Sequence, residues 1–509
     1  MKLLNQPRSQ TNRYYPAIFW VVSVLFVFVC ASVFVYLFRV VLEIPLSQTF
    51  DEVLTRKIFD LVVKSLFLAF AVSILASVFG LVFSWLVERT DLKFKKTWNI
   101  SIVLSMAMPS YVLAYAWLEK YEAFASMSGA IFILTLVTIP FAYINMRIAI
   151  KRLDVQLEEV ANSLGSSDFD TFVGIVFPQL RKAFFAGMLI CFLYVITDFG
   201  AVSTLRVEVF TWVIYGAYRA GFSPERAAIL SVLLFLIALA VVVFEGFVSS
   251  NRKESELNKV QLVAKPAKLG VVNLFGQLAI GSYIGLTLAF PIIRSINWTF
   301  EYKSSFSFQD FKQPIINTLG VGTVTALFAT FIAFCISVVA TRSRTGKSIS
   351  RLVMTIHAIP GIVTAIAFVF VGTRVVPGIY LEWPLVIIAL CVSFGYLAIT
   401  PIKNSLDRKN KTLLDVSSSL GRGNYFTLTK VTIPLSSNGL KAAAILVFVA
   451  AIKELPITLL LRPNEQNTLA TYLWSNLGVS KFAVVAPSML LLIFISAVPL
   501  MFLIKGKYD

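Results

Sequence analysis

Long runs of apolar positions alternate with shorter polar segments along almost the whole chain. Twelve runs approach the roughly 20 apolar residues that a helix needs to cross a bilayer. They lie near residues 16–41, 60–86, 98–118, 128–147, 183–204, 227–249, 270–293, 314–340, 350–373, 383–402, 440–461 and 483–504. The ten-residue alternation of a membrane β-barrel is absent. We therefore expect an all-α polytopic membrane protein with about 12 transmembrane helices.

Composition agrees with this pattern. The mean hydropathy is +0.81 and only 14% of residues are charged, which does not fit a water-exposed surface. The four cysteines lie singly within apolar runs and lack metal-ligand spacing, so we interpret them as packing residues. A single histidine, His357, excludes a histidine-based metal site, and no clustered carboxylates favour an integral-membrane enzyme.

Lys and Arg are distributed unevenly between alternate polar segments. If the N-terminus is inside, 30 of the 45 basic residues fall in cytoplasmic segments. The positive-inside rule then accounts for the net charge of +18 without nucleic acid. We expect a multi-pass protein of the cell (inner) membrane with both termini cytoplasmic, residues 1–15 as an N-terminal arm and 505–509 as a tail. The first run is too long for a signal-peptide core.

A polar segment in the first half of the chain recurs in the second half. Glu159-Val-Ala-Asn-Ser-Leu-Gly165 and a later Pro178 reappear as Asp415-Val-Ser-Ser-Ser-Leu-Gly421 and Pro434, at an offset of 256 throughout. A weaker echo pairs "KSLFLAF" at Lys64 with "NTLGVGT" at Asn317. The repeat predicts two parallel six-helix halves, 16–249 and 270–504, joined by a cytoplasmic linker at 250–269.

Each copy of the repeated segment, about 151–182 and 403–440, should form a helix, a stop and a second helix. Gly165 can end the first helix in the left-handed conformation, and Ser166 or Ser167 can cap the next. Phe169, Phe172, Val173 and Val176 have helical spacing and predict an apolar stripe. A single copy could simply pack back on its own bundle, whereas two matched copies fit two sockets of a two-fold partner.

This pattern resembles the EAA loop of ABC-importer permeases, whose coupling helix docks on the ATPase subunit. Val160 departs from the strict form in one copy, and Asp415-Val416-Ser417 departs in the other. The resemblance implies two ATPase copies inside the cell, a substrate-binding protein outside, and docking residues at the matching positions. These are Glu159, Ala161, Gly165, Phe169, Phe172, Pro178, Asp415, Ser417, Gly421, Tyr425 and Pro434.

No nucleotide site is expected on this chain. The nearest match to a phosphate-binding loop is "TRSRTGKS", Thr341 to Ser348, in which Thr341 replaces the first glycine and no soluble strand precedes the motif. We interpret it as a basic loop flanking the membrane. The chain itself should hold no cofactor, and ATP should be bound by the partner ATPase.

A second matched pair of segments follows the repeat. "VITDFGAVSTLR" and "AIKELPITLLLR" place Asp198 opposite Glu454 and Arg206 opposite Arg462, with Lys453 alongside. Ionisable groups at membrane depth are costly and mark candidate pathway residues. Carboxylates suit a hard cation. The alternative is structural, because Gly200 and Pro456 suggest broken helix ends that a carboxylate can cap.

Two further stretches narrow the resemblance. "KELPITLLLRP" with "TLATYLW", and "DFGAV" with "FTWVIYGAY", resemble the ferric-iron group of these permeases. That resemblance implies an importer for ferric iron delivered by a binding protein. Relatives for thiamine, phosphonates, polyamines and sulfate share the architecture and remain alternatives. A secondary transporter of two six-span halves, driven by an ion gradient, is a less favoured alternative.

Overall fold

The computed structural model describes residues 17–43, 45, 55–219, 224–250, 266–268, 270, 272–301, 309–356, 359–406, 416–417, 419–477 and 482–505. Within these ranges the chain is helical, and the one β-type pairing is an isolated bridge between Thr90 and Ala267. This confirms the predicted all-α class. His357 and Asp415 lie outside the described residues.

The chain divides into two compact units, each described here by itself. The smaller unit comprises the described residues of Met1–Phe38, Lys312–His357 and Thr364–Leu469, and the larger unit comprises the rest. The larger unit contains most of the first half. Its elements are α3 (Arg56–Arg89), α4 (Lys95–Leu104), η1 (Ser105–Ala107), α5 (Ser110–Lys120), η2 (Glu122–Phe124), α6 (Met127–Ile150), α7 (Val155–Ser163), α8 (Asp168–Thr171), η3 (Phe172–Val176), α9 (Phe177–Thr197), α10 (Gly200–Thr204), α11 (Phe210–Arg219), α12 (Pro224–Ser250), α13 (Val272–Ile284), η5 (Gly285–Ala289), α14 (Phe290–Glu301), nearly all of α23 (Leu469–Leu477) and α24 (Phe482–Lys505).

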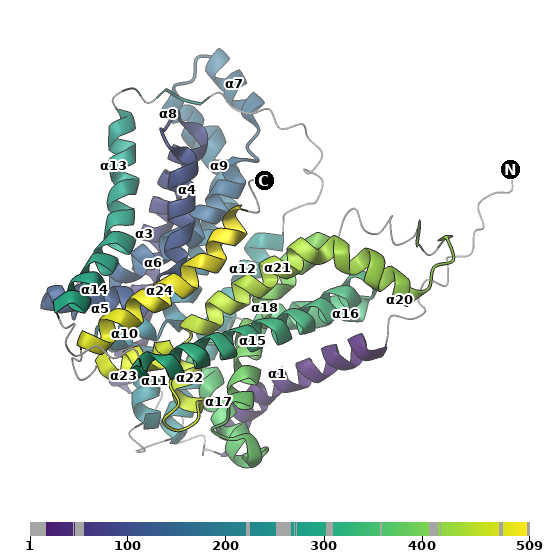
Figure 1. The fold of residues 1–509 in the computed structure, drawn as a ribbon. Helices are drawn as coiled ribbons and strands as arrows, with labels where there is room; N and C mark the ends of the chain where they lie inside the picture. Colours follow the sequence, from purple (N-terminus) through teal and green to yellow (C-terminus); the bar gives the residue numbers. More distant parts are fainter. Residues whose placement is uncertain are drawn as a thin grey trace, which may run out of the picture. The chain divides into compact units, whose positions relative to one another are not determined.

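The smaller unit is built mainly from the second half (Figure 1). Its elements are most of α1 (Ala17–Glu43), α15 (Gln309–Arg342) and α17 (Gly361–Arg374), together with α16 (Arg344–Thr355), η8 (Pro377–Ile379), α18 (Trp383–Leu406), α20 (Asn424–Thr427), η9 (Leu428–Thr432), α21 (Ile433–Lys453) and α22 (Pro456–Leu461). The units therefore do not coincide with the sequence halves. The division into halves at 16–249 and 270–504 describes the repeat and stays a prediction.

Each half contributes its first membrane helix to the unit built around the other half. In the smaller unit, Phe19 of α1 packs edge-on against Phe334 of α15, with ring centroids 6.1 Å apart. In the larger unit, Phe290 of α14 stacks on Trp117 of α5 at 4.2 Å. Burial of these aromatic faces stabilises the exchange.

Ten described helices are long and apolar enough to cross a membrane, and an eleventh span results if α4 and α5 count as one. These two helices meet at 90° across a short break. The break falls at Pro109, which lacks an N–H and cannot continue a helix. The shorter α17 also follows a proline, Pro360. Within the described residues each of the twelve predicted runs coincides with one helix or with a broken pair of helices, but a count of twelve spans is not established.

In the described part of the chain, three wide π-helical turns interrupt the membrane helices, and each ends two residues before a proline. They are η3, η5 and η9, followed by Pro178, Pro291 and Pro434. A proline inside an α-helix collides with the carbonyl four residues earlier and cannot bond to it. Widening the turn by one residue relieves this conflict while the preceding N–H still finds a carbonyl, as Phe177 does with Phe172.

The larger unit depends on close backbone contact between α3 and α6. A Cβ built on Gly80 would lie 2.7 Å from the Ala142 Cβ and 2.8 Å from the Tyr143 nitrogen. Small residues at such crossings let membrane helices approach and gain dispersion contacts. Gly320 on α15 offers a contrast, because a Cβ there meets nothing within 4 Å.

We predict that Gly80→Ala lowers the stability of the purified chain by about 1–3 kcal/mol, because the added methyl overpacks the α3–α6 crossing. Gly320→Ala should be neutral or stabilising by up to about 1 kcal/mol, since alanine is the better helix former. Thermal unfolding in detergent measures both. Equal melting shifts for the two variants would contradict the proposed crossing.

Candidate functional site

The first repeat segment (151–182) forms the predicted helix, stop and second helix. Asp154 caps α7 by accepting the N–H of Gln156 at 3.2 Å. Gly165 then adopts a left-handed conformation with φ +87°, and the N–H of Ser166 bonds back to the Ala161 carbonyl at 3.1 Å. This closure satisfies carbonyls that the helix end would otherwise leave unpaired. The predicted left-handed conformation of Gly165 is confirmed.

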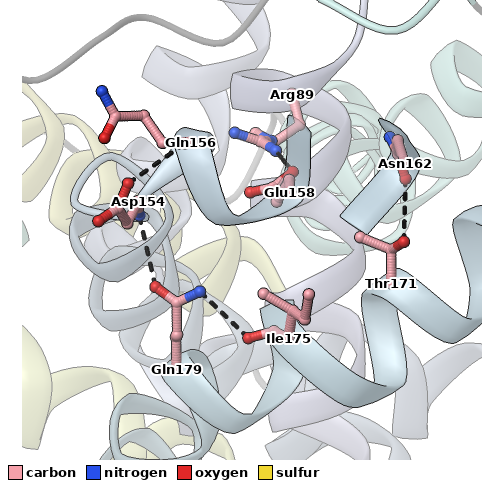
Figure 2. A network of polar contacts seen from close by, with 8 residues as sticks. All are labelled: Arg89, Asp154, Gln156, Glu158, Asn162, Thr171, Ile175 and Gln179. Carbon is pink, nitrogen blue, oxygen red and sulfur yellow. Dashed lines mark hydrogen bonds and ion pairs between the residues drawn. The ribbon is translucent and has the colours of Figure 1, made fainter. Parts of the chain in front are cut away.

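A hydroxyl ties the two short helices of this segment together. Ser167 caps α8 by accepting the N–H of Asp170 at 3.1 Å, as one of the two predicted serines should. Thr171 at the end of α8 then donates its hydroxyl to the Asn162 side chain on α7 at 2.9 Å (Figure 2). The angle between the helices is therefore held at both the glycine and the threonine.

The second repeat segment (403–440) closes in the same way where the structure describes it. Gly421 has φ +70°, and the N–H of Arg422 bonds to the Ser417 carbonyl at 3.2 Å. Thr427, 256 residues after Thr171, shares a hydrogen bond of 2.8 Å with the Ser417 hydroxyl. The sequence analysis did not identify these two threonines as helix-joining residues, although a threonine at the same position in both copies was a visible signal.

The first repeat segment is anchored to the end of α3. Arg89 forms an ion pair with Glu158 of α7, and its guanidinium lies 5.2 Å from the Trp85 ring centroid. Trp85 in turn meets Phe172 edge-on at 5.4 Å. Figure 2 shows this ion pair together with the polar contacts that join α7 to the start of α9. Burial raises the pKa of the Glu158 carboxyl, and the Arg89 charge opposes that change.

The two copies expose apolar side chains at equivalent positions. In the first segment Val160, Leu164 and Phe169 are 57%, 82% and 75% exposed. Their counterparts are Val416, Leu420 and Tyr425, which are 49%, 72% and 79% exposed. Large apolar groups this open to solvent mark an interaction surface. We call the six residues the exposed apolar set.

The predicted apolar stripe is only partly correct. Phe169 and Val173 are exposed, but Phe172 is half-buried against Trp85 and Val176 is buried at 2%. The π turn η3 inserts one residue per turn and rotates the later positions away from the face that Phe169 occupies. Val160 and Leu164, which the stripe omitted, take their place.

The remaining predicted residues of the repeat segments differ in exposure. Glu159 is exposed on α7, while Ala161 and Ser417 are buried where the chain closes. Pro178 and Pro434 are exposed in the first turns of α9 and α21.

The two acidic candidates cap short helices within their units. The Asp198 carboxylate accepts the N–H of Ala201 at 2.8 Å and the hydroxyl of Ser110 at 2.6 Å. The Glu454 carboxylate, 8% exposed, accepts the N–H groups of Ile457 and Thr458 at 2.8 and 3.1 Å. Each carboxylate thus satisfies donors at the start of α10 or α22.

The basic candidates lie at less enclosed positions. Arg206 is exposed and follows α10 with φ +56°. Arg462 is half-buried and donates to the Gln466 carbonyl at 3.1 Å. Lys453 is half-buried and ends α21. Asp198 and Arg206 belong to the larger unit, whereas Lys453, Glu454 and Arg462 belong to the smaller unit.

Hydroxyls on equivalent helices cap the next short helix in each half. Ser65 on α3 accepts the N–H of Phe210 at 3.1 Å, and Thr318 on α15 accepts the N–H of Leu469 at 2.7 Å. The weak echo between "KSLFLAF" and "NTLGVGT" was the signal for this pair.

Two stretches that suggested the ferric-iron group meet in the larger unit. Trp474, from "TLATYLW", lies 6.3 Å from Phe199 and 5.8 Å from Tyr215, measured between ring centroids. Phe199 also packs against Tyr215 at 5.0 Å. The aromatic cluster therefore joins segments from both sequence halves.

Comparison with known proteins finds similarity to transport-system permeases. Residues 80–250 match the family described as binding-protein-dependent transport system inner membrane component. The chain is 29% identical to the Fe(3+)-transport system permease protein FbpB 2 of Haemophilus influenzae, over 93% of this chain and 95% of that protein. It is 22% identical to the ferric transport system permease protein FbpB of Actinobacillus pleuropneumoniae, over 86% and 70%.

A relative named for another solute matches a shorter part of the chain. The sulfate transport system permease protein CysT of Escherichia coli is 24% identical over 41% of this chain and 83% of its own length. Residues 80–250 are thus similar to the binding-protein-dependent transport system inner membrane component, and over nearly its whole length the chain resembles permeases named for ferric-iron transport.

Proposed function

We propose that this chain is the membrane permease of an ATP-driven importer, in which both halves together line the route into the cytoplasm. The observation that carries the proposal is the matched pair of repeat segments. Both end a helix at a left-handed glycine, and both present apolar side chains at the same three positions. One copy could be a local packing accident, but two at an offset of 256 require a common purpose.

The partner that suits this pair is a cytoplasmic ATPase present in two copies. A short helix with an apolar face binds by entering a groove on its partner. Leu164 and Leu420, the most exposed aliphatic members of the exposed apolar set, would be the central contacts. ATP is bound by that partner, and closure of the two ATPases shifts the permease between its states through these contacts.

The cargo we propose is ferric iron delivered by an extracytoplasmic binding protein. Support comes from the Haemophilus influenzae relative, whose similarity spans both halves, whereas the sulfate relative corresponds to less than half of the chain. The segments that resemble the iron group also pack on one another through Phe199, Tyr215 and Trp474.

The topology belongs to the same proposal. Placing both repeat segments in the cytoplasm also places both termini there, in agreement with the distribution of Lys and Arg. A secondary transporter would need no docking surface. Uptake that persists when the ATPase is absent would favour that alternative.

We predict that Leu164→Asp combined with Leu420→Asp abolishes ATPase binding and reduces uptake at least tenfold, because a charge enters each apolar contact. Copurification of the ATPase and radioactive iron uptake in vesicles measure the two effects. Val375→Asp is the matched control, since Val375 is 64% exposed in the turn that follows α17. Normal uptake by the double variant would overturn the docking assignment.

We also predict that Gly165→Val weakens coupling, because a β-branched residue is strained at φ +87° by about 1–2 kcal/mol or more. Gly174→Val should have little effect on coupling, as Gly174 has open space and no positive φ. Uptake per ATP hydrolysed by the reconstituted complex compares the variants. An unchanged ratio for Gly165→Val would count against this glycine setting the coupling geometry.

For the acidic pair we predict that Asp198→Asn and Glu454→Gln leave transport within about twofold of wild type, because the amide oxygen still accepts one capping N–H group in each variant. Asp198→Ala should destabilise the chain by about 0.5–2 kcal/mol through loss of the cap. Thermal unfolding and uptake are measured side by side. Lost uptake with intact stability in the amide variants would instead assign the carboxylates to the cargo pathway.

A further inference from the structure

A cavity with a positively charged lining lies between α16 and the ends of α15 and α18 in the smaller unit. It has a volume of about 200 Å³. The lining residues are Ala340, Lys347, Ser350, Arg351, Met354 and Lys403. Three of the six carry a full positive charge, and none carries a negative one. We call this feature the cationic cavity.

The basic motif "TRSRTGKS" builds one wall of the cavity. This motif was predicted to be a loop, but from Arg344 onward it is helical, and Ser343 caps α16 by accepting the N–H of Gly346 at 2.8 Å. A Cβ on Gly346 would lie 2.4 Å from the Val339 carbonyl oxygen, so only glycine lets α16 fold back so tightly on α15. This close return brings Lys347 and Arg351 to the cavity.

The three cations are not neutralised by the part of the chain that the structure describes. Lys347 and Arg351 are one helical turn apart, a spacing at which like charges destabilise each other. The described acids of the smaller unit are Glu382, Glu454 and Glu465. They lie before the start of α18, after the end of α21 and beyond α22, whereas Lys403 is near the end of α18.

In the first half, a carboxylate neutralises the cation that corresponds to Lys403. Arg147, 256 residues before Lys403, pairs with Glu88 at 2.5 Å, and Lys151 reaches the same carboxylate at 3.5 Å. Glu88 is the penultimate residue of the 34-residue helix α3. At the penultimate position of α15, also 34 residues long, stands Thr341. In the second half Lys403 takes the place of Arg147, whereas Asp407, outside the described residues, takes the place of Lys151. No carboxylate takes the place of Glu88, because Thr341 stands there.

We propose that the cationic cavity binds a phosphate group, and that the phosphate belongs to the headgroup of an anionic membrane lipid. Basic pockets between membrane helices near the cytoplasmic surface are suited to such headgroups. Met354 and Leu352, 39% and 46% exposed on α16, give the acyl chains an apolar surface beside the charges. Assignment to the cytoplasmic leaflet rests on the topology proposed above, whereas binding itself does not.

The test measures lipid binding to the full-length chain in detergent by native mass spectrometry. Phosphatidylglycerol should bind more tightly than phosphatidylcholine. Lys347→Gln combined with Arg351→Gln should weaken phosphatidylglycerol binding roughly 25-fold, at about fivefold per charge removed. Inorganic phosphate is added as a competitor. Competition at millimolar concentration identifies free phosphate as a second source of the ligand, whereas binding without competition assigns the site to the lipid.

Two further variants separate the cavity from general charge effects. Lys312→Gln with Arg374→Gln removes two exposed cations of the same unit, near the start of α15 and at the end of α17, and should leave binding unchanged. Thr341→Glu restores the carboxylate found in the first half and should also weaken binding while all three cations remain. Thermal unfolding confirms that the variants fold.

Equal weakening by both double variants, or none by either, would overturn the proposal. If a folded Thr341→Glu variant still bound phosphatidylglycerol as tightly, the cavity cations would not be what holds the lipid phosphate. If the lipid proposal is wrong but the proposed function is right, the cavity variants bind lipid like the unmodified chain and still copurify with the ATPase. Loss of the docking interaction in the Leu164 and Leu420 variants reports separately on the proposed function.

Discussion

A backbone N–H or carbonyl that a broken helix releases inside a membrane must find a partner within the protein, because no water is available. This chain breaks its helices repeatedly, and at four of these breaks a side chain accepts a released N–H group. Asp198 and Glu454 receive the first N–H groups of α10 and α22. Ser65 and Thr318 receive those of two later helices. The π turns solve the related problem of a proline within a span.

The same constraint connects the membrane region to the repeat segments. Pro178 and Pro434 force a wide turn where the short helix joins a membrane helix. That turn sets which side chains face out beside Phe169 and Tyr425. The left-handed glycines then close the other end. The exposed apolar set is therefore positioned by the backbone hydrogen bonds of the π turns on one side and of the left-handed glycines on the other.

The sequence predicted those features that are decided locally. Gly165 and Gly421 follow from the need for positive φ after a helix, and Ser167 follows from capping chemistry. The stripe from Phe169 to Val176 was only partly correct, because 3.6-residue periodicity does not hold through a π turn. The exchange of first helices between halves could not be predicted, since hydropathy identifies a membrane helix without naming its neighbour.

That exchange imposes an order on how the chain is completed during synthesis. Phe19 of α1 packs against Phe334, about 300 residues later in the chain. At roughly 5–20 residues per second, the first helix waits about 15–60 s in the bilayer before its partner is made. During that interval Cys30 and Val33, both fully buried in the finished protein, face lipid or the insertion machinery instead. Helix α1 therefore reaches its final neighbours long after it enters the membrane.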